Sequence, residues 1–91
     1  MNPKEMLEKE KFLRVYEWHD NAGIKYPKHT HKGEVALFIV NGDITFHFPD
    51  NTTHTVHTGE RFDVPVGIEH SAIVGQNGCD YVVGEMIEGD S

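Results

Sequence analysis

The sequence is poor in cysteine and in positive charge. It contains one cysteine, Cys79, and 8 lysine and arginine residues against 15 aspartate and glutamate residues. A lone cysteine excludes a disulfide within the chain and favours a reducing compartment. The formal net charge is −7, and the lysines near the start alternate with glutamates. Nucleic acid and anionic membrane surfaces both require clustered positive charge, so we expect neither as a partner.

Long apolar runs are also missing. No segment approaches the ~20 apolar residues that cross a bilayer. Residues 1–12 lack the apolar core and small-residue cleavage site of a signal peptide, so we expect a cytoplasmic protein. Two catalytic signatures are absent as well: a glycine-rich phosphate loop, and the G-x-S-x-G turn of serine hydrolases.

What the sequence does contain is a β pattern along most of its length. We expect one domain over residues 1–91, in which residues 1–11 form a short helix or arm, because Pro3 suits a first helical turn. Beyond it, stretches rich in aromatic and β-branched residues predict about eight short strands of a β-sandwich or barrel. The clearest are residues 12–18, 35–40, 44–48, 53–58, 61–64, 71–74 and 81–87. Asn41-Gly42-Asp43 predicts a hairpin turn.

Seven histidines stand out in so short a chain, and two of them are separated by one residue in His29-Thr30-His31. Residues i and i+2 of a strand project from the same face. Two imidazoles placed in this way can reach one ion at the ~2.0–2.1 Å that nitrogen ligands require. The pair alone is a weak signal that is more typical of surface histidines, and a third imidazole from another strand would be needed to complete a site.

Gly23 is followed after five residues by His29-Thr30-His31, and Gly59 is followed after five residues by Pro65-Val66-Gly67 and then, past two more residues, by His70. This spacing resembles that of the cupins, a family of small antiparallel jelly-roll β-barrels. The first cupin motif, G(x)5HxH(x)3E(x)6G, falls on residues 23–42, and the second, G(x)5PxG(x)2H(x)3N, falls on residues 59–74. The residues that fit are Gly23, His29, His31, Gly42, Gly59, Pro65, Gly67 and His70. The resemblance implies an all-β fold, an antiparallel jelly-roll barrel with a short N-terminal helix or arm.

The resemblance also implies that His29, His31 and His70 bind one divalent transition metal ion in the mouth of the barrel. Neutral imidazoles suit Fe, Mn, Ni, Cu or Zn, and ligand type alone does not choose among them.

Two residues depart from the cupin pattern. Val35 stands where the family has a glutamate ligand, and Val74 stands where the second motif ends in asparagine. Glu34, one position before Val35, points to the other face of a regular strand, although a β-bulge would return it. We expect that Glu34 is not an essential ligand and keep it as the alternative fourth one.

Other residues are weaker candidates for the pocket. We expect the pocket lining to include three candidates: His47, Tyr26 and Tyr81. The alternative for His47 is exposure to solvent, and the alternative for the two tyrosines is packing in the core. The apolar run Val35–Val40 predicts a strand covered on both faces. Together with the resemblance, it predicts a homodimer.

By resemblance, the function is metal-dependent chemistry on a small organic molecule, as a dioxygenase, isomerase or lyase. A non-catalytic module that binds or senses a ligand or metal is the alternative, because this fold supports many functions.

Overall fold

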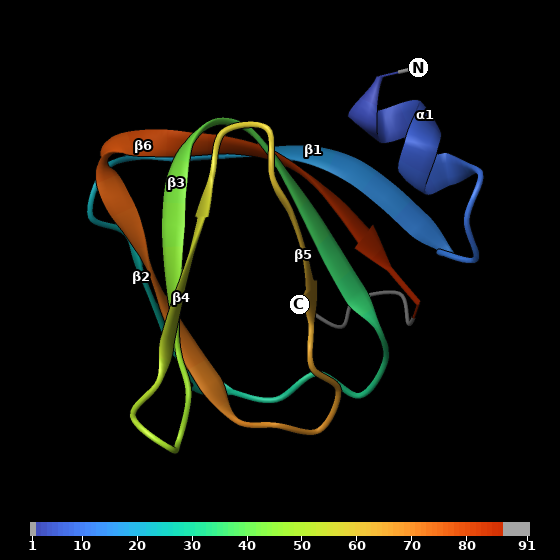
Figure 1. The fold of residues 1–91 in the computed structure, drawn as a ribbon. Coiled ribbons are helices and arrows are strands. Elements are labelled where there is room, and N and C mark those ends of the chain that lie inside the picture. The colour runs from blue at the N-terminus through green and yellow to red at the C-terminus, as the bar shows by residue number, and fades with distance from the viewer. Residues whose placement is uncertain (1, 87–91) are drawn as a thin grey trace.

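The computed structural model describes residues 2–86, which form one helix and six strands (Figure 1). In chain order these are α1 (Pro3–Glu8), β1 (Arg14–Asp20), β2 (Lys25–His29), β3 (Val35–His47), β4 (Thr53–His57), β5 (Arg61–Val64) and β6 (His70–Glu85). No helix among these residues is both long and apolar enough to cross a membrane.

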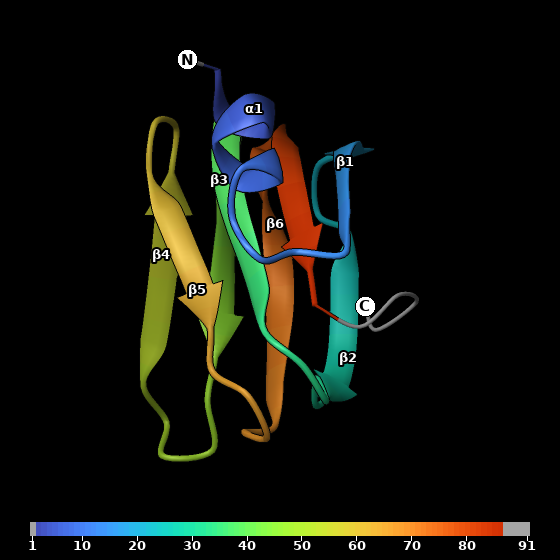
Figure 2. The ribbon, with the colours of Figure 1, turned by 90° about the vertical axis from the view of Figure 1, so that its right-hand side faces the viewer.

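All strand pairs are antiparallel, and together they enclose a barrel with two faces (Figures 1 and 2). One face contains β1, the second half of β6, the first half of β3, and β5. The other contains β2, the first half of β6, the second half of β3, and β4. The long strands β3 and β6 pass through both faces and join them. The all-β fold with a short N-terminal helix, predicted from the sequence, is confirmed.

The hairpin predicted at residues 41–43 is wrong, because β3 continues through it. The pairing of β3 with β6 shifts register on both sides of Gly42, which has φ +94°. A Cβ atom at Gly42 would lie 2.0 Å from the carbonyl oxygen of Gly78, so glycine permits the two strands to approach here. The Asn-Gly signal therefore marks a bulge that bends the strand from one face of the barrel to the other.

The same bend unites two further predicted strands. Residues 71–74 and 81–87 were expected to be separate, but His70–Glu85 is one strand; Ile87 lies outside the described residues. Gly78, with φ +75°, lies in β6 opposite Gly42 at this bend. Six strands thus take the place of about eight because two glycine-containing segments bend without turning back.

The core lies inside the barrel, where alternate residues of each strand meet. Its buried apolar members come from the four strands β3, β4, β5 and β6, and partly buried aromatic side chains pack on them. They are Val35, Leu37, Ile39, Ile44, Phe46, Val56, Val64, Ala72, Val74, Cys79, Tyr81 and Val83.

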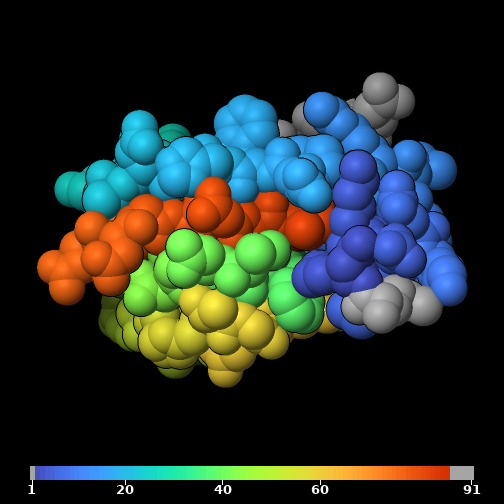
Figure 3. Space-filling model, turned by 90° about the horizontal axis from the view of Figure 1, so that it is seen from above, coloured from blue at the N-terminus to red at the C-terminus, as the bar shows by residue number. Residues whose placement is uncertain are grey.

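A second, smaller cluster lies outside the barrel beneath α1. Within the helix or arm expected over residues 1–11, the helix spans Pro3–Glu8, and its N-cap Asn2 accepts a 2.8 Å hydrogen bond from the amide of Glu5. It places Leu7 against Ala36 and Val82, and all three are buried. The outer face of β3 is therefore covered in part by the chain's own arm, at one end of the face shown in Figure 3. Val40, further along β3, stays 50% exposed.

Candidate functional site

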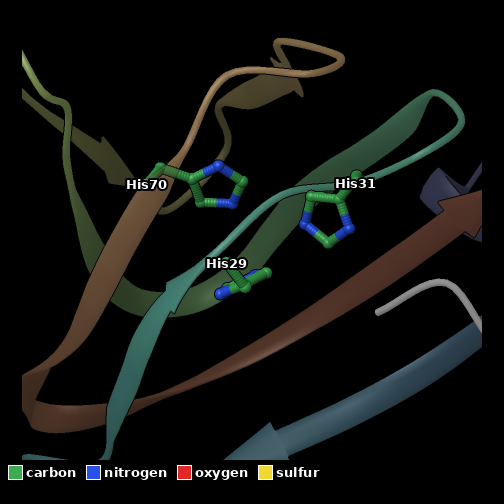
Figure 4. A group of neighbouring side chains, drawn as sticks. All are labelled: His29, His31 and His70. Carbon is green, nitrogen blue, oxygen red and sulfur yellow. The ribbon is translucent and has the colours of Figure 1, made fainter.

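The structure brings His29, His31 and His70 together at one end of the barrel (Figure 4). His29 is the last residue of β2 and pairs with His70, the first residue of β6. His31 lies beyond the strand, and its carbonyl accepts a 3.2 Å hydrogen bond from the amide of Gly67. That bond ties the loop before His70 to the segment that carries the other two histidines.

A bulge in β2 sets the direction of His29. The register shifts between Tyr26 and His29, so three residues of β2 advance while β6 advances two. Their partners Ala72 and His70 are both buried on the inner side of β6. Tyr26 and His29 consequently share the inner face, which regular alternation would not allow.

The three imidazoles are close enough to share one ion. Their ring centroids are 4.5 Å apart for His29 and His70, 4.9 Å for His29 and His31, and 5.0 Å for His31 and His70. One ligand nitrogen from each ring lies within 4.8 Å of the others. Nitrogens that bind one zinc ion tetrahedrally at ~2.1 Å are about 3.4 Å apart, so a bound ion would draw these nitrogens together by up to about 1.4 Å.

Hydrogen bonds select the tautomer of two of these rings. Nδ1 of His29 donates to the carbonyl of Pro27 at 2.7 Å, and Nδ1 of His70 donates to the carbonyl of Ile68 at 3.0 Å. A carbonyl only accepts, so Nδ1 carries the proton and Nε2 is left as a lone-pair donor. This is the outer hydrogen bond that metal-ligating histidines make.

His70 has the strongest features of a ligand. It is 1% exposed, and its Nε2 has no hydrogen-bond partner. Burial, together with the neighbouring His29 and His31, lowers the pKa of His70, although the bond to Ile68 opposes this. The ring is therefore neutral at physiological pH, which is the form that binds a metal. A buried, unpartnered lone pair aimed into a cluster of imidazoles fits a metal ion.

Glu34 lies apart from the histidines. Its side chain is 51% exposed and forms an ion pair with Lys11 of the N-terminal arm. Val35 instead occupies the inner face, 4% exposed. The alternation expected for this strand is thus present, and the carboxylate expected as the alternative fourth ligand points away from the cluster.

Aromatic side chains that sequence reasoning missed surround His70. The ring centroids of Phe46 and Phe48 lie 5.9 Å and 6.2 Å from it, and Phe62 lies 5.0 Å from Phe46. His54 stacks on Phe62 with a centroid distance of 4.6 Å. The signal was present in the alternation of Phe46 and Phe48, which places both on the face opposite His47.

The three pocket candidates have different surroundings. His47 is exposed and does not join the histidine cluster. Tyr26 and Tyr81 point into the barrel and donate hydrogen bonds to Asp20 Oδ2 at 2.5 Å and 2.7 Å. Burial, and hydrogen bonding to Asp20, raise the pKa of Tyr26.

Asp20 joins the two tyrosines, and sequence reasoning did not single it out. Trp18 donates a 3.0 Å hydrogen bond to its other carboxylate oxygen. Asp20 is 7% exposed and satisfied on both oxygens, so it organises the barrel interior at the end of β1.

Cys79 has no part in this chemistry. It is buried in the core, and burial raises the pKa of its thiol to about 12. The thiol is therefore protonated and inert at neutral pH.

None of the three histidines lines either of two surface hollows. The first, of about 410 Å³, lies between the N-terminal arm and β5, next to Lys11 and Arg61. The second, of about 400 Å³, lies beside Trp18 and Val40.

Comparison with known proteins gives structural relatives only. No family model matches the chain, and no curated protein matches its sequence. Among solved structures, the chain is similar to protein NMB1881 from Neisseria meningitidis, with 26% identity and a TM-score of 0.65 over 91% of this chain and 94% of that one.

Two further structures extend this likeness. A cupin-2 domain containing protein from Shewanella frigidimarina is 18% identical, with a TM-score of 0.65 over 76% of this chain and 65% of that one. The DMSP lyase DddQ from Ruegeria pomeroyi is 22% identical, with a TM-score of 0.72 over 90% of this chain and 42% of that one. The chain thus spans less than two thirds of the length of these two proteins. Together with the antiparallel topology, these likenesses show that the chain has the cupin fold.

Proposed function

We propose that this protein binds one divalent transition metal ion through His29, His31 and His70, and acts at that ion on a small organic molecule. The observation that carries the proposal is the buried, unpartnered Nε2 of His70, which faces two further imidazoles whose ligand nitrogens lie within 4.8 Å. When bound, the ion supplies Lewis-acid or redox chemistry and leaves positions open for a ligand, since residues 2–86 bring three protein donors together.

The aromatic side chains beside His70 indicate the kind of molecule that enters. Phe48 and Phe62 are only partly buried and pack on the core next to the cluster. Val66 and Ile68, in the loop before His70, are 48% and 46% exposed. A substrate with an apolar body and one metal-binding oxygen or nitrogen matches this combination.

Three reaction classes suit such a site. Dioxygenase, isomerase and lyase reactions all suit three neutral nitrogen ligands with open positions, and one structural neighbour is described as a DMSP lyase. A non-catalytic module that binds or senses a ligand or metal is the second candidate. It is favoured by the observation that none of the three histidines lines either surface hollow, since a metal ion can be held without a substrate pocket.

The proposal is tested by the metal content of the purified protein. The chain is stripped with a chelator, incubated in turn with Fe(II), Mn, Ni, Cu and Zn, dialysed and subjected to elemental analysis. We expect about one ion per chain for at least one metal, with binding lost as pH falls through ~6.5, because protons compete for neutral imidazoles. Absence of a stoichiometric ion for all five metals contradicts the proposal.

The two candidates are separated by turnover. The metal-loaded protein and His70→Ala are incubated with a panel of small carboxylic acids, enols and sulfonium compounds, and products are followed by NMR. Conversion that requires both the metal and His70 identifies an enzyme. Ligand-induced line broadening without conversion identifies a binding module.

A further inference from the structure

Within residues 2–86, two buried side-chain polar atoms have no hydrogen-bond partner: Nε2 of His70 and Oε1 of Glu85. The first is explained by the proposed metal. The second is not, because Glu85 does not belong to the cluster of metal-ligand atoms. A buried carboxylate oxygen without a partner costs folding free energy, and such an atom in a native fold indicates a partner supplied from elsewhere.

Glu85 projects into the barrel. It is the last residue of β6 and is 0% exposed. Val83, two residues earlier, belongs to the inner core, whereas Gly84 faces the ring of Phe12 on the outside. Tyr16 of the neighbouring strand donates a 2.9 Å hydrogen bond to Oε2 of Glu85. This bond fixes the carboxylate and leaves Oε1 directed at the interior.

The end of β6 lies at the same end of the barrel as the histidines. Glu85 pairs directly with Val35, the position at which the cupin pattern has its glutamate. The amide of Met86 donates a 2.9 Å hydrogen bond to the carbonyl of Glu34, in the short segment that follows His31. Glu85 therefore approaches the histidine end from the opposite face of the barrel.

We infer that Glu85 is an outer carboxylate of the metal centre, whose Oε1 accepts a hydrogen bond from an O–H or N–H group held at the ion. In the resting protein that group is a water molecule, and on ligand binding it is a hydroxyl or amine of the ligand itself. The inference rests on the proposed function. It specifies that the ligands of this site carry a hydrogen-bond donor beside their metal-binding atom.

Charge and geometry both support this role. Glu85 does not contact the ion directly, since its oxygens are not within reach of all three histidine nitrogens. A carboxylate one shell further out still attracts a divalent cation and orients what the cation binds. Tyr16 is then a positioning residue, because it acts only through Oε2 of Glu85.

The test is metal binding by Glu85→Gln, measured by calorimetric titration of the stripped protein with Zn and with Ni. Outer partners of metal sites usually contribute 10–100-fold in affinity, and we expect a loss of at least about tenfold. Glu17→Gln is the matched control: it removes the same charge from an exposed side chain of β1, and we expect a change below about twofold.

A second variant covers the case in which Glu85→Gln does not fold. Glu85→Met replaces the buried carboxylate with an apolar chain of similar length. We expect it to raise the melting temperature of the metal-free protein and to weaken metal binding as much as Gln does. If Glu85 had only a structural role, its replacement by Met would lower the melting temperature and leave the affinity for metal unchanged.

Failure of this inference is distinguishable from failure of the proposed function. Wild-type protein that binds metal, with Glu85→Gln and Glu85→Met binding it equally tightly, overturns the role of Glu85 alone. Wild-type protein that binds no metal overturns the proposed function, and this inference with it. Loss of metal affinity in the two Glu85 variants, but not in Glu17→Gln, supports the role of Glu85 and the proposed function together.

Discussion

Lys11 and Glu34 form an ion pair on the outside of the barrel, with side chains 58% and 51% exposed. This pair directs the only carboxylate of the first cupin motif toward solvent and away from the histidines. The inner position next to it is held by Val35, so the described part of the chain has three imidazoles at the site where the family pattern has three imidazoles and a glutamate.

Val35→Glu should restore the missing carboxylate and shift metal preference. Position 35 is 4% exposed and faces the interior, so a glutamate there adds a hard, anionic oxygen to the nitrogen donors. We expect affinity for Mn to rise by about tenfold while affinity for Ni changes less. Val35→Gln, which has the same length without the charge, is the control; equal Mn binding by the two variants would rule out this account of the position.

Gly42→Ala should destabilise the fold far more than Gly59→Ala. Both glycines have positive φ, +94° and +86°. A Cβ atom at Gly42 would lie 2.0 Å from the carbonyl oxygen of Gly78, whereas a Cβ atom at Gly59 would have no neighbour within 4 Å. We expect a loss of about 1–2 kcal/mol for Gly59→Ala from backbone strain alone. For Gly42→Ala we expect about 4 kcal/mol or more. Urea unfolding measures both, and equal losses would contradict the close approach of β3 and β6.

Protonation of His19 should make the free energy of unfolding decline as pH rises. Its Nδ1 lies 2.5 Å from the Asp80 carboxylate, and hydrogen bonds to Asp80 and then Asn21 raise its pKa. A raised folded pKa stabilises the fold below the unfolded value of ~6.5, and this contribution is lost as pH rises through the folded value. We expect His19→Gln to remove that decline in urea-unfolding series of the metal-free protein. An unchanged decline in the variant would refute the assignment.

The protein should be a homodimer in solution. The N-terminal arm covers part of the outer face of β3, which reduces the need for a partner inferred from the sequence. It leaves Trp18 and Val40 52% and 50% exposed beside a hollow of about 400 Å³. We expect light scattering at tens of micromolar to give a dimer mass for wild type and a monomer mass for Val40→Lys. A monomer mass for the wild type would exclude the dimer.

Much of the fold was readable from the sequence because its signals are local. Alternation of side chains gave the strands, and the spacing of Gly59, Pro65, Gly67 and His70 gave the topology by resemblance. What failed was the hairpin at Asn41-Gly42-Asp43. The same dipeptide suits a turn and a bulge, and only the distant Gly78, which permits the close approach, decides between them.

The candidate site was readable to a smaller extent. The three histidines followed from motif spacing, but their tautomers depend on the carbonyls of Pro27 and Ile68, which no pattern specifies. Asp20 and Glu85 were missed because a single acidic residue near the end of a strand is typical of an exposed side chain. Only pairing between strands distant in sequence shows that both are buried.

The most direct test of the account is a calorimetric titration with Ni and Zn of wild type, His70→Ala and Glu34→Gln, with exposed His47→Ala as control and circular dichroism to check folding. We predict that His70→Ala loses more than the ~100-fold that outer partners contribute. Glu34→Gln and His47→Ala should stay within roughly threefold of wild type, as expected for exposed charges. Loss of metal by Glu34→Gln as severe as that of His70→Ala, or wild-type affinity in His70→Ala, would contradict a site built on three histidines.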